Sequence, residues 1–173
     1  YLDNSISIFN LNTGEVVHKI NNRSNYVNSA KFNKGNSSIL TVSNDSIARI
    51  WDSNTGKLTW QTHKSKDFRT QTGTFSPDGQ RILFTKFNNG NGLLNSNIKK
   101  YGGGHVYALN GDHLFSLSVN TGGVYDGIYS PDGSIILTKN KDNAIRLFDA
   151  KNGNLLHKLQ HDGPLHLAVF SPD

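Results

Sequence analysis

Cysteine and methionine are absent from this 173-residue chain, and proline occurs only four times. Without cysteine the chain can form no disulfide, no thiolate zinc site and no thiol nucleophile. No stretch approaches the roughly 18 apolar residues that a membrane-spanning helix needs, and the N-terminus has no signal-peptide pattern. The missing methionine predicts that the natural chain starts upstream of Tyr1.

Neither sign of charge dominates the chain. It contains 18 basic and 13 acidic residues, and like charges form no block. The net charge of +5 favours acidic partners electrostatically but is far below the density of a dedicated nucleic-acid binder. Hydrophobic residues make up 35% of the chain and there are 17 glycines, a composition typical of a turn-rich globular protein.

What the chain does contain is a repeated pattern: a short β run, an aromatic residue and a polar turn that ends in glycine. The clearest copies span residues 47–58 and 144–155, an earlier copy spans 8–16, and a degraded one spans 106–112. The aromatic residues of the four copies are Phe9, Trp51, Tyr107 and Phe148.

A second pattern lies between copies of the first, as Ser-Pro-Asp-Gly at 76–79 and again at 130–133. It is a tight-turn sequence, because proline presets φ and glycine takes the left-handed position. A looser version spans 30–35, and another breaks off at the end of the chain. The aromatics before these turns are Phe32, Phe75, Tyr129 and Phe170. Both patterns recur together at spacings of about 40–55 residues, which predicts four-stranded propeller blades.

At these residues the chain resembles the WD40 family of β-propellers. The resemblance rests on Ile50-Trp51-Asp52, on Leu147-Phe148-Asp149, on the Ser-Pro-Asp turns, and on an aspartate six residues before the aromatic: Asp3, Asp45 and Asp142. It implies an all-β propeller of four-stranded antiparallel blades. It implies little about the task, because propellers serve many functions.

In this family each repeat supplies strands d, a, b and c, counted from the outer edge of one blade into the next. The repeats are then expected at 1–15 (partial), 16–56, 57–112, 113–153 and 154–173 (partial), about fifteen strands or four blades' worth. The last strand is expected at 165–170. Two interpretations remain open: part of a larger propeller, which we favour because the chain stops before strand b of its last repeat and so leaves an unpaired edge, or a small ring closed between the first strand and the last.

Several positions depart from the family pattern. The family places a histidine in the d–a loop that hydrogen-bonds through the strand-b Ser/Thr and the b–c aspartate toward the strand-c aromatic. Here those positions are Arg23, Lys66, Asn120 and His161, and only the last fits. The strand-b hydroxyls are present as Thr41, Thr85 and Thr138. The resemblance therefore implies a partial network, and we expect cross-strand apolar packing to hold the blades.

An insertion at 88–103 replaces the b–c loop of the third repeat. Long loops in compact domains are usually functional or disordered, and three consecutive glycines at 102–104 predict a hinge or a close backbone approach. The position of several lysines and arginines in the repeats places them on the same face as this loop. They form either a basic docking surface or ordinary solvated loops. The candidate partner-binding residues are Arg23, Lys66, Arg69, Leu93, Leu94, Lys99, Lys100, Tyr101 and Lys141.

Histidines suggest a metal or catalytic site, but the pattern argues against one. His18, Trp60, Phe115 and His157 each follow a turn glycine by four residues, which predicts rings that pack against the neighbouring blade. His161, Asp162 and His166 have no matching nucleophile and no second carboxylate at a suitable spacing. We therefore expect no enzyme activity, no metal and no cofactor.

The function can be predicted only by class. The first hypothesis is a WD40-type scaffold or sensor module that binds proteins or peptides, acidic or phosphorylated ones included, through its d–a and b–c loops. Nucleic-acid backbone is a weaker alternative partner. The second hypothesis is a TolB-like periplasmic or secreted propeller, or the propeller cap of a multidomain enzyme, because residues 75–84 fit those repeats equally well. We expect a cytoplasmic location under the first hypothesis.

Overall fold

A computed structural model describes residues 5–22, 26–63, 68–88, 102–119 and 123–171. The described chain forms fourteen strands in four antiparallel sheets. The first sheet pairs β1 (Ser5–Phe9) with β2 (Val16–Asn21). The second contains β3 (Val27–Phe32), β4 (Ser38–Ser43), β5 (Ala48–Asp52) and β6 (Leu58–Gln61).

The remaining two sheets repeat the order of the second. The third contains β7 (Phe68–Phe75), β8 (Arg81–Asn88), β9 (Gly104–Ala108) and β10 (His113–Leu117). The fourth contains β11 (Val124–Tyr129), β12 (Ile135–Asn140), β13 (Ala144–Asp149) and β14 (Leu155–Gln160). Each is therefore a meander in sequence order, so the expected blade with strands a to d is confirmed.

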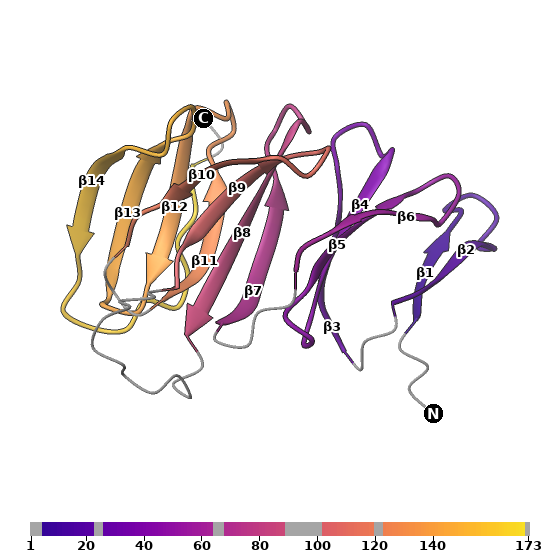
Figure 1. The fold of residues 1–173 in the computed structure, drawn as a ribbon, viewed down its shortest axis with the longest axis horizontal. Helices are drawn as coiled ribbons and strands as arrows, with labels where there is room; N and C mark the ends of the chain where they lie inside the picture. Colours follow the sequence, from indigo (N-terminus) through magenta and orange to yellow (C-terminus); the bar gives the residue numbers. More distant parts are fainter. Residues whose placement is uncertain (1–4, 23–25, 64–67, 89–101, 120–122, 172–173) are drawn as a thin grey trace.

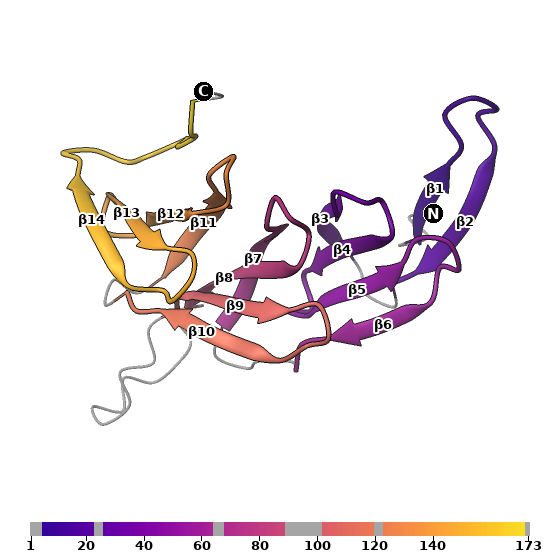
Figure 2. The ribbon, with the colours of Figure 1, turned by 90° about the horizontal axis from the view of Figure 1, so that it is seen from above.

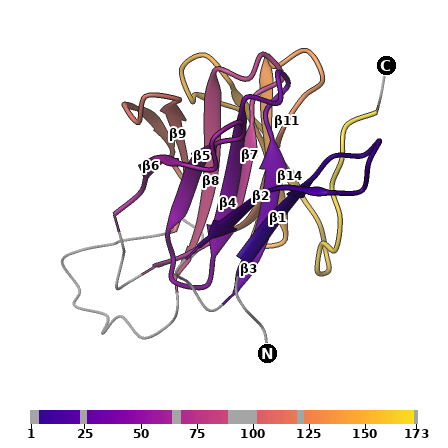
Figure 3. The same cartoon turned by 90° about the vertical axis from the view of Figure 1, so that its right-hand side faces the viewer.

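The sheets stand side by side in chain order (Figure 1). Seen from above they fan out along an open arc, with β3, β7 and β11 on the concave side and β6 and β10 on the convex side (Figure 2). Figure 3 looks along this row of sheets, with β1 and β2 nearest the viewer. The arrangement is that of propeller blades, with closure of the ring not seen.

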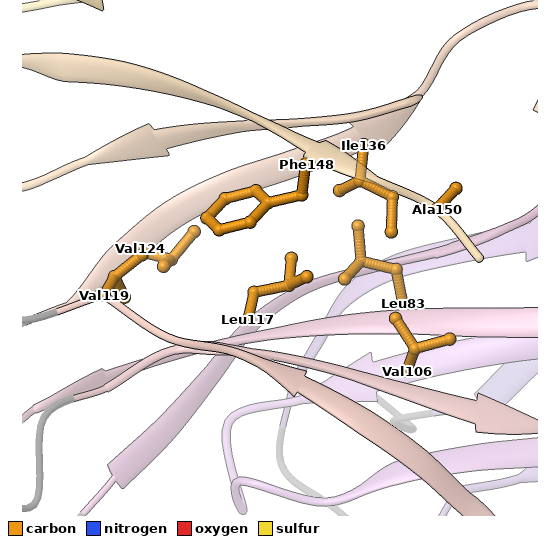
Figure 4. Packing of buried hydrophobic residues seen from close by; sticks show 8 residues of the cluster. All are labelled: Leu83, Val106, Leu117, Val119, Val124, Ile136, Phe148 and Ala150. Atoms are coloured by element: carbon orange, nitrogen blue, oxygen red, sulfur yellow. The ribbon is translucent and has the colours of Figure 1, made fainter. Parts of the chain in front are cut away.

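Three apolar clusters hold the sheets to one another. Ile20 of the first sheet meets Ile39 and Trp51 of the second. The second and third sheets meet around seven buried side chains: Leu40, Val42, Ala48, Ile50, Phe75, Ile82 and Phe84. The third and fourth meet around Leu83, Val106, Leu117, Val119, Val124, Ile136, Phe148 and Ala150, which point at one another in Figure 4. Each interface is thus shared by consecutive sheets, as expected for a repeat protein.

Rings on the outer strands pack against the next sheet, as their spacing predicted. The Trp60 ring of β6 stacks on Phe84, with 6.0 Å between centroids, and lies 5.4 Å from Tyr107. The Phe115 ring lies against Gly153 of the fourth sheet, and His18 lies against Gly56 of the second. His157 is exposed on β14, which has no neighbouring sheet within the described residues.

The Ser-Pro-Asp-Gly turns also form as expected. Gly79 and Gly133 have φ values of 73° and 76°, in the left-handed region that glycine favours. The hydroxyl of Ser130 donates to Asp132 at 2.6 Å, and the Asp132 carboxylate accepts again from the Ser134 amide and hydroxyl. These bonds, the Ser130 one foremost, lower the pKa of Asp132 to about 2.

The expected fifteenth strand is wrong. Residues 165–170 form no strand, although they run beside β12, where Lys139 Nζ donates to the His166 carbonyl at 2.9 Å. An extended segment becomes a strand only when a neighbour exchanges backbone hydrogen bonds with it, and no described segment does so here.

The small closed ring is likewise not observed. Within the described residues β1 pairs with β2 alone, and it lies at the opposite end of the arc from β14 (Figure 2).

The glycine run at the end of the insertion confirms the predicted close backbone approach. A Cβ on Gly102 would overlap the Lys86 carbonyl, and one on Gly104 would meet the Leu117 side chain. Gly103 also accepts a backbone hydrogen bond from Lys86 at 2.8 Å. These contacts bring the chain back into the sheet before β9 begins. The preceding residues, 89–101, lie outside the described part.

Candidate functional site

The second and fourth sheets each have a polar frame under their loops, and in the second sheet it is built around Trp51. The indole Nε1–H donates to Thr41 Oγ1 at 2.9 Å across β4 and β5, with both residues buried. Asp45, in the turn between these strands, accepts from the Ile47 amide at 3.1 Å and from Arg49 Nη2 at 2.6 Å. Arg49 of β5 thus binds Asp45, the aspartate whose counterpart in the WD40 family belongs to the hydrogen-bond network of a histidine.

The fourth sheet repeats the ion pair, with two hydrogen bonds in place of one. Arg146 donates from Nη1 and Nη2 to the two carboxylate oxygens of Asp142, at 2.9 and 2.6 Å. Lys158 Nζ lies 3.9 Å from the same carboxylate. The hydrogen bond from Arg146 is the main reason that the pKa of Asp142 lies below its usual value. The Phe148 ring has no N–H to donate. Thr138 Oγ1 instead accepts a hydrogen bond from Asn140 Nδ2 at 3.1 Å.

These frames position what we call the d–a/b–c face: the starts of β3, β7 and β11 with the ends of β4, β8 and β12. In Figure 1 this is the lower edge of the sheets. Among its described residues are two of the predicted partner-binding cations, Arg69 at the start of β7 and Lys141 just after β12. Both are exposed.

An aromatic–lysine cluster lies on this face between the third and fourth sheets. Phe87, at the end of β8, stacks on Tyr125 of β11 with ring centroids 5.0 Å apart. Lys141 Nζ sits 5.4 Å from the centre of the Phe87 ring, within the range of a cation–π contact. Tyr125 is 41% exposed, so this apolar and cationic surface is open to solvent.

A polar pocket of about 230 Å³ lies on the same face between the second and third sheets. Its lining consists of Asn28, Ser43, Asn44, Arg69, Thr70 and Gln71. Arg69 is the cross-strand partner of Phe87, so the pocket and the aromatic–lysine cluster meet at the ends of β7 and β8. Beside the pocket, Tyr26 is 55% exposed, and its carbonyl accepts from the Asn44 amide at 3.0 Å.

The opposite face has a larger cavity of about 380 Å³ with different chemistry. Its walls include Asp78, Asp132 and Asp149, together with Arg81, whose Nη1 donates to the Ala150 carbonyl at 2.7 Å. Tyr129 also lines it; burial raises the pKa of its hydroxyl, which has no partner in the described structure. The three carboxylates make this cavity the acidic counterpart of the polar pocket.

One histidine pair lies on the outer strands of the third sheet. His105 Nδ1 and His113 Nε2 both approach Ser116 Oγ, at 2.9 and 3.0 Å. Burial, with smaller contributions from the Lys86 and His113 charges, lowers the pKa of His105 to about 4. No carboxylate hydrogen-bonds either ring in the described ranges, so the pair lacks the orienting acid of a catalytic triad. No group of three metal-ligating side chains occurs there either.

The structure places the remaining predicted residues as follows. Phe9, Tyr107, Trp51 and Phe148 lie on β1, β9, β5 and β13, the last two of them buried. His161 is exposed, and its described hydrogen bonds are those of its backbone, to Asn143 and Gln160. The predictions that lie outside the described residues are Asp3, Arg23, Lys66, Leu93, Leu94, Lys99, Lys100 and Tyr101.

Sequence reasoning missed both the arginines and the aromatic cluster. Arg49 and Arg146 each follow a b–c aspartate by four residues, a spacing visible in the sequence. Phe87, Tyr125 and Tyr26 had no such signal, because each sits at a strand end where no pattern indicates its neighbours. The same is true of the carboxamides in the polar pocket.

Comparison with known families agrees with this geometry. The WD domain, G-beta repeat, matches residues 14–52, and the anaphase-promoting complex subunit 4 WD40 domain matches residues 98–169. The chain carries WD40 repeats. The matched segments contain Asn28, Ser43 and Asn44 of the polar pocket and Tyr125 and Lys141 of the aromatic–lysine cluster, whereas β7 and β8 lie in the unmatched stretch 53–97. None of the curated proteins matches the chain.

WD40 repeat domains are typically protein-interaction scaffolds and are usually non-catalytic. Within the described ranges, no helix has the length and apolar character that a membrane span requires.

Proposed function

We propose that this chain is a non-catalytic interaction module that docks a protein partner on its d–a/b–c face. The observation that carries the proposal is the aromatic–lysine cluster. Tyr125 and Phe87 offer a rigid aromatic surface with Lys141 beside it, and tyrosine and phenylalanine rings are enriched at protein–protein interfaces.

The proposed binding mechanism is docking onto a surface that strand ends hold rigid. Gly123, two residues before Tyr125, forms a bridge to Phe87 and accepts from the Lys141 amide at 3.1 Å, so backbone bonds hold Phe87 and Lys141 to the segment that carries Tyr125. A partner would therefore meet a surface that is already ordered, and binding would lose little conformational entropy.

Charge supports an acidic partner. The net charge of the chain is +5, and the described cations of this face, Arg69 and Lys141, are both exposed. Such charge steers acidic partners toward the face and raises the association rate at low salt. Acidic or phosphorylated partners and a cytoplasmic location are both part of this proposal.

Photo-crosslinking from defined positions tests the proposal. A benzophenone amino acid at position 125 samples the d–a/b–c face, and one at position 34 samples the opposite face, where Lys34 is exposed in the β3–β4 turn. We expect discrete protein adducts from position 125 only, and we expect Lys141→Glu to reduce them without lowering the melting temperature. Equal adducts from both positions, or adducts from position 34 alone, would reject the proposed face.

A further inference from the structure

The polar pocket between the second and third sheets has a composition that selects for anions. One guanidinium, three carboxamides and two hydroxyls line it, and no carboxylate does so among the described residues. Asp45, next in sequence to the lining residue Asn44, is turned to Arg49 at 2.6 Å. A negative group would therefore meet donors and a positive charge, whereas a cation would meet Arg69.

Most of the lining side chains are free to bind. Asn28, Asn44, Arg69 and Gln71 make no side-chain hydrogen bond or ion pair within the described structure. Unpaired carboxamides and a guanidinium in one concave site provide many N–H donors that a ligand can use without breaking a bond inside the protein.

The two hydroxyls are held in place from beneath. Asn22, which is fully buried, donates from Nδ2 to Ser43 Oγ at 2.6 Å, and Ser43 is fully buried as well, so this pair forms part of the floor beneath the pocket. Thr70 Oγ1 donates to the Ser46 carbonyl at 2.9 Å, which ties the start of β7 to the β4–β5 turn. The floor of the pocket is thus built by buried groups of both sheets.

We infer that this pocket receives the phosphoryl group of a phosphorylated serine or threonine on the docked partner. The inference rests on the proposed function, since the pocket adjoins the aromatic–lysine cluster on the same face. A carboxylate has only a pair of oxygens to accept hydrogen bonds, whereas a phosphoryl group has three and carries more negative charge. The supply of donors around Arg69 matches the larger anion.

Exposed Tyr26 and the neighbouring cluster indicate how the rest of the partner lies. Tyr26 flanks the pocket on the second sheet, and Phe87 begins the cluster on the other side of Arg69. An extended segment with its phosphoryl group in the pocket can therefore place residues on either side against aromatic rings.

The test is a titration of the ¹⁵N-labelled protein with three pentapeptides: Gly-Gly-phosphoserine-Gly-Gly, the same peptide with glutamate, and the same peptide with serine. The side-chain N–H signals of Asn28, Asn44, Gln71 and Arg69 report the pocket directly. We expect saturable shifts with the phosphopeptide, binding weaker by about tenfold or more with the glutamate peptide, and none with the serine peptide.

Variants locate the site. Arg69→Gln is expected to weaken phosphopeptide binding by about tenfold or more, because it removes the one guanidinium among the described residues that line the pocket. Lys34→Gln, a matched loss of one exposed cation on the opposite face, is expected to change it by less than about twofold. Thermal melting checks that both variants fold, and a partly folded Arg69→Gln is replaced by Arg69→Lys, for which intermediate binding is expected.

Three outcomes of these titrations would contradict the phosphoryl site. Equal binding of the glutamate peptide, shifts confined to other residues, or an unchanged affinity in Arg69→Gln would each overturn the phosphoryl site. Crosslinking from position 125 would still succeed in that case, so failure of this inference is distinct from failure of the proposed function.

Discussion

The second and fourth sheets are two versions of one design, and they differ in how each satisfies its buried polar groups. Trp51 and Phe148 occupy the same place in register, opposite Ile39 and Ile136. Thr41 and Thr138 likewise lie opposite Arg49 and Arg146. Thr41 Oγ1 accepts a hydrogen bond from the Trp51 indole. The Phe148 ring has no N–H, and Thr138 Oγ1 accepts a hydrogen bond from the Asn140 side chain instead.

This difference shows what the repeat requires. Most buried hydroxyls and guanidinium groups form hydrogen bonds, and the partner can come from another position of the same blade. The ring on strand c can therefore be tryptophan or phenylalanine provided that a neighbour takes over the hydrogen bond. The following predictions test this comparison.

Phe148→Ala should have the largest effect. The Phe148 ring is 1% exposed within the eight-residue cluster that joins the third and fourth sheets. Its removal leaves a cavity between two sheets, and such truncations cost about 3–5 kcal/mol of unfolding free energy. Urea denaturation measures the loss, with Leu156→Ala on the exposed face of β14 as the control, expected to cost less than about 1 kcal/mol. A similar loss in both variants would contradict the assigned core.

Removal of the two aspartates should come next, and unequally. Asp142→Ala breaks a two-bond contact and leaves Arg146, which is 7% exposed, without its counter-charge. Because the Asp142 carboxylate is partly open to solvent, we expect about 2 kcal/mol rather than the full cost of a buried pair. Asp45→Ala also removes the acceptor of the Ile47 amide, but it breaks one described bond of the Arg49 guanidinium against two of Arg146, and should cost about 1 kcal/mol. Chemical denaturation of both variants gives the order, and a greater loss for Asp45→Ala would reverse our comparison.

Thr41→Val and Thr138→Val isolate the hydroxyls with little change in shape. The first leaves the Trp51 N–H buried without an acceptor, which we expect to cost about 1–2 kcal/mol. In the second, Asn140 keeps its bonds to the Thr138 and Ala144 carbonyls, so the cost should be below about 1 kcal/mol. Tryptophan fluorescence, to which Trp51 and Trp60 both contribute, follows unfolding in both proteins. Equal losses would mean that the indole bond contributes nothing particular to the second sheet.

The sequence predicts the sheets well because their signals are local. Turn glycines and Ser-Pro-Asp sequences set the strand boundaries, and the repeated pattern at 144–155 forms β13, the turn after it and the start of β14. The expected strand at 165–170 failed for a non-local reason: a strand exists only beside a partner, and no pattern within the segment reports whether one is there.

The candidate site was predicted less completely, for the same reason. Arg69 and Lys141 could be assigned to the d–a/b–c face because position in the repeat determines the face. That Lys141 lies over Phe87, and that Arg69 shares a pocket with Asn28 and Asn44, depends on how neighbouring sheets pack. Residues from different repeats meet there, and a repeat pattern describes each one alone.

The smallest effect should be a change in pH dependence. Bonding to Arg146 lowers the pKa of Asp142 in the folded protein, so the folded state binds that proton less readily than the unfolded chain does. The pair therefore stabilises the protein above the ordinary aspartate pKa of about 4, and this contribution is lost as the pH falls through the lower folded value. We expect unfolding free energy to drop more steeply below about pH 4 in the wild type than in Asp142→Asn, by a fraction of a kcal/mol. Urea denaturation at pH 3 and pH 6 measures the difference. Parallel profiles in the two proteins would show that the fourth sheet gains no more from its ion pair than an uncharged amide provides.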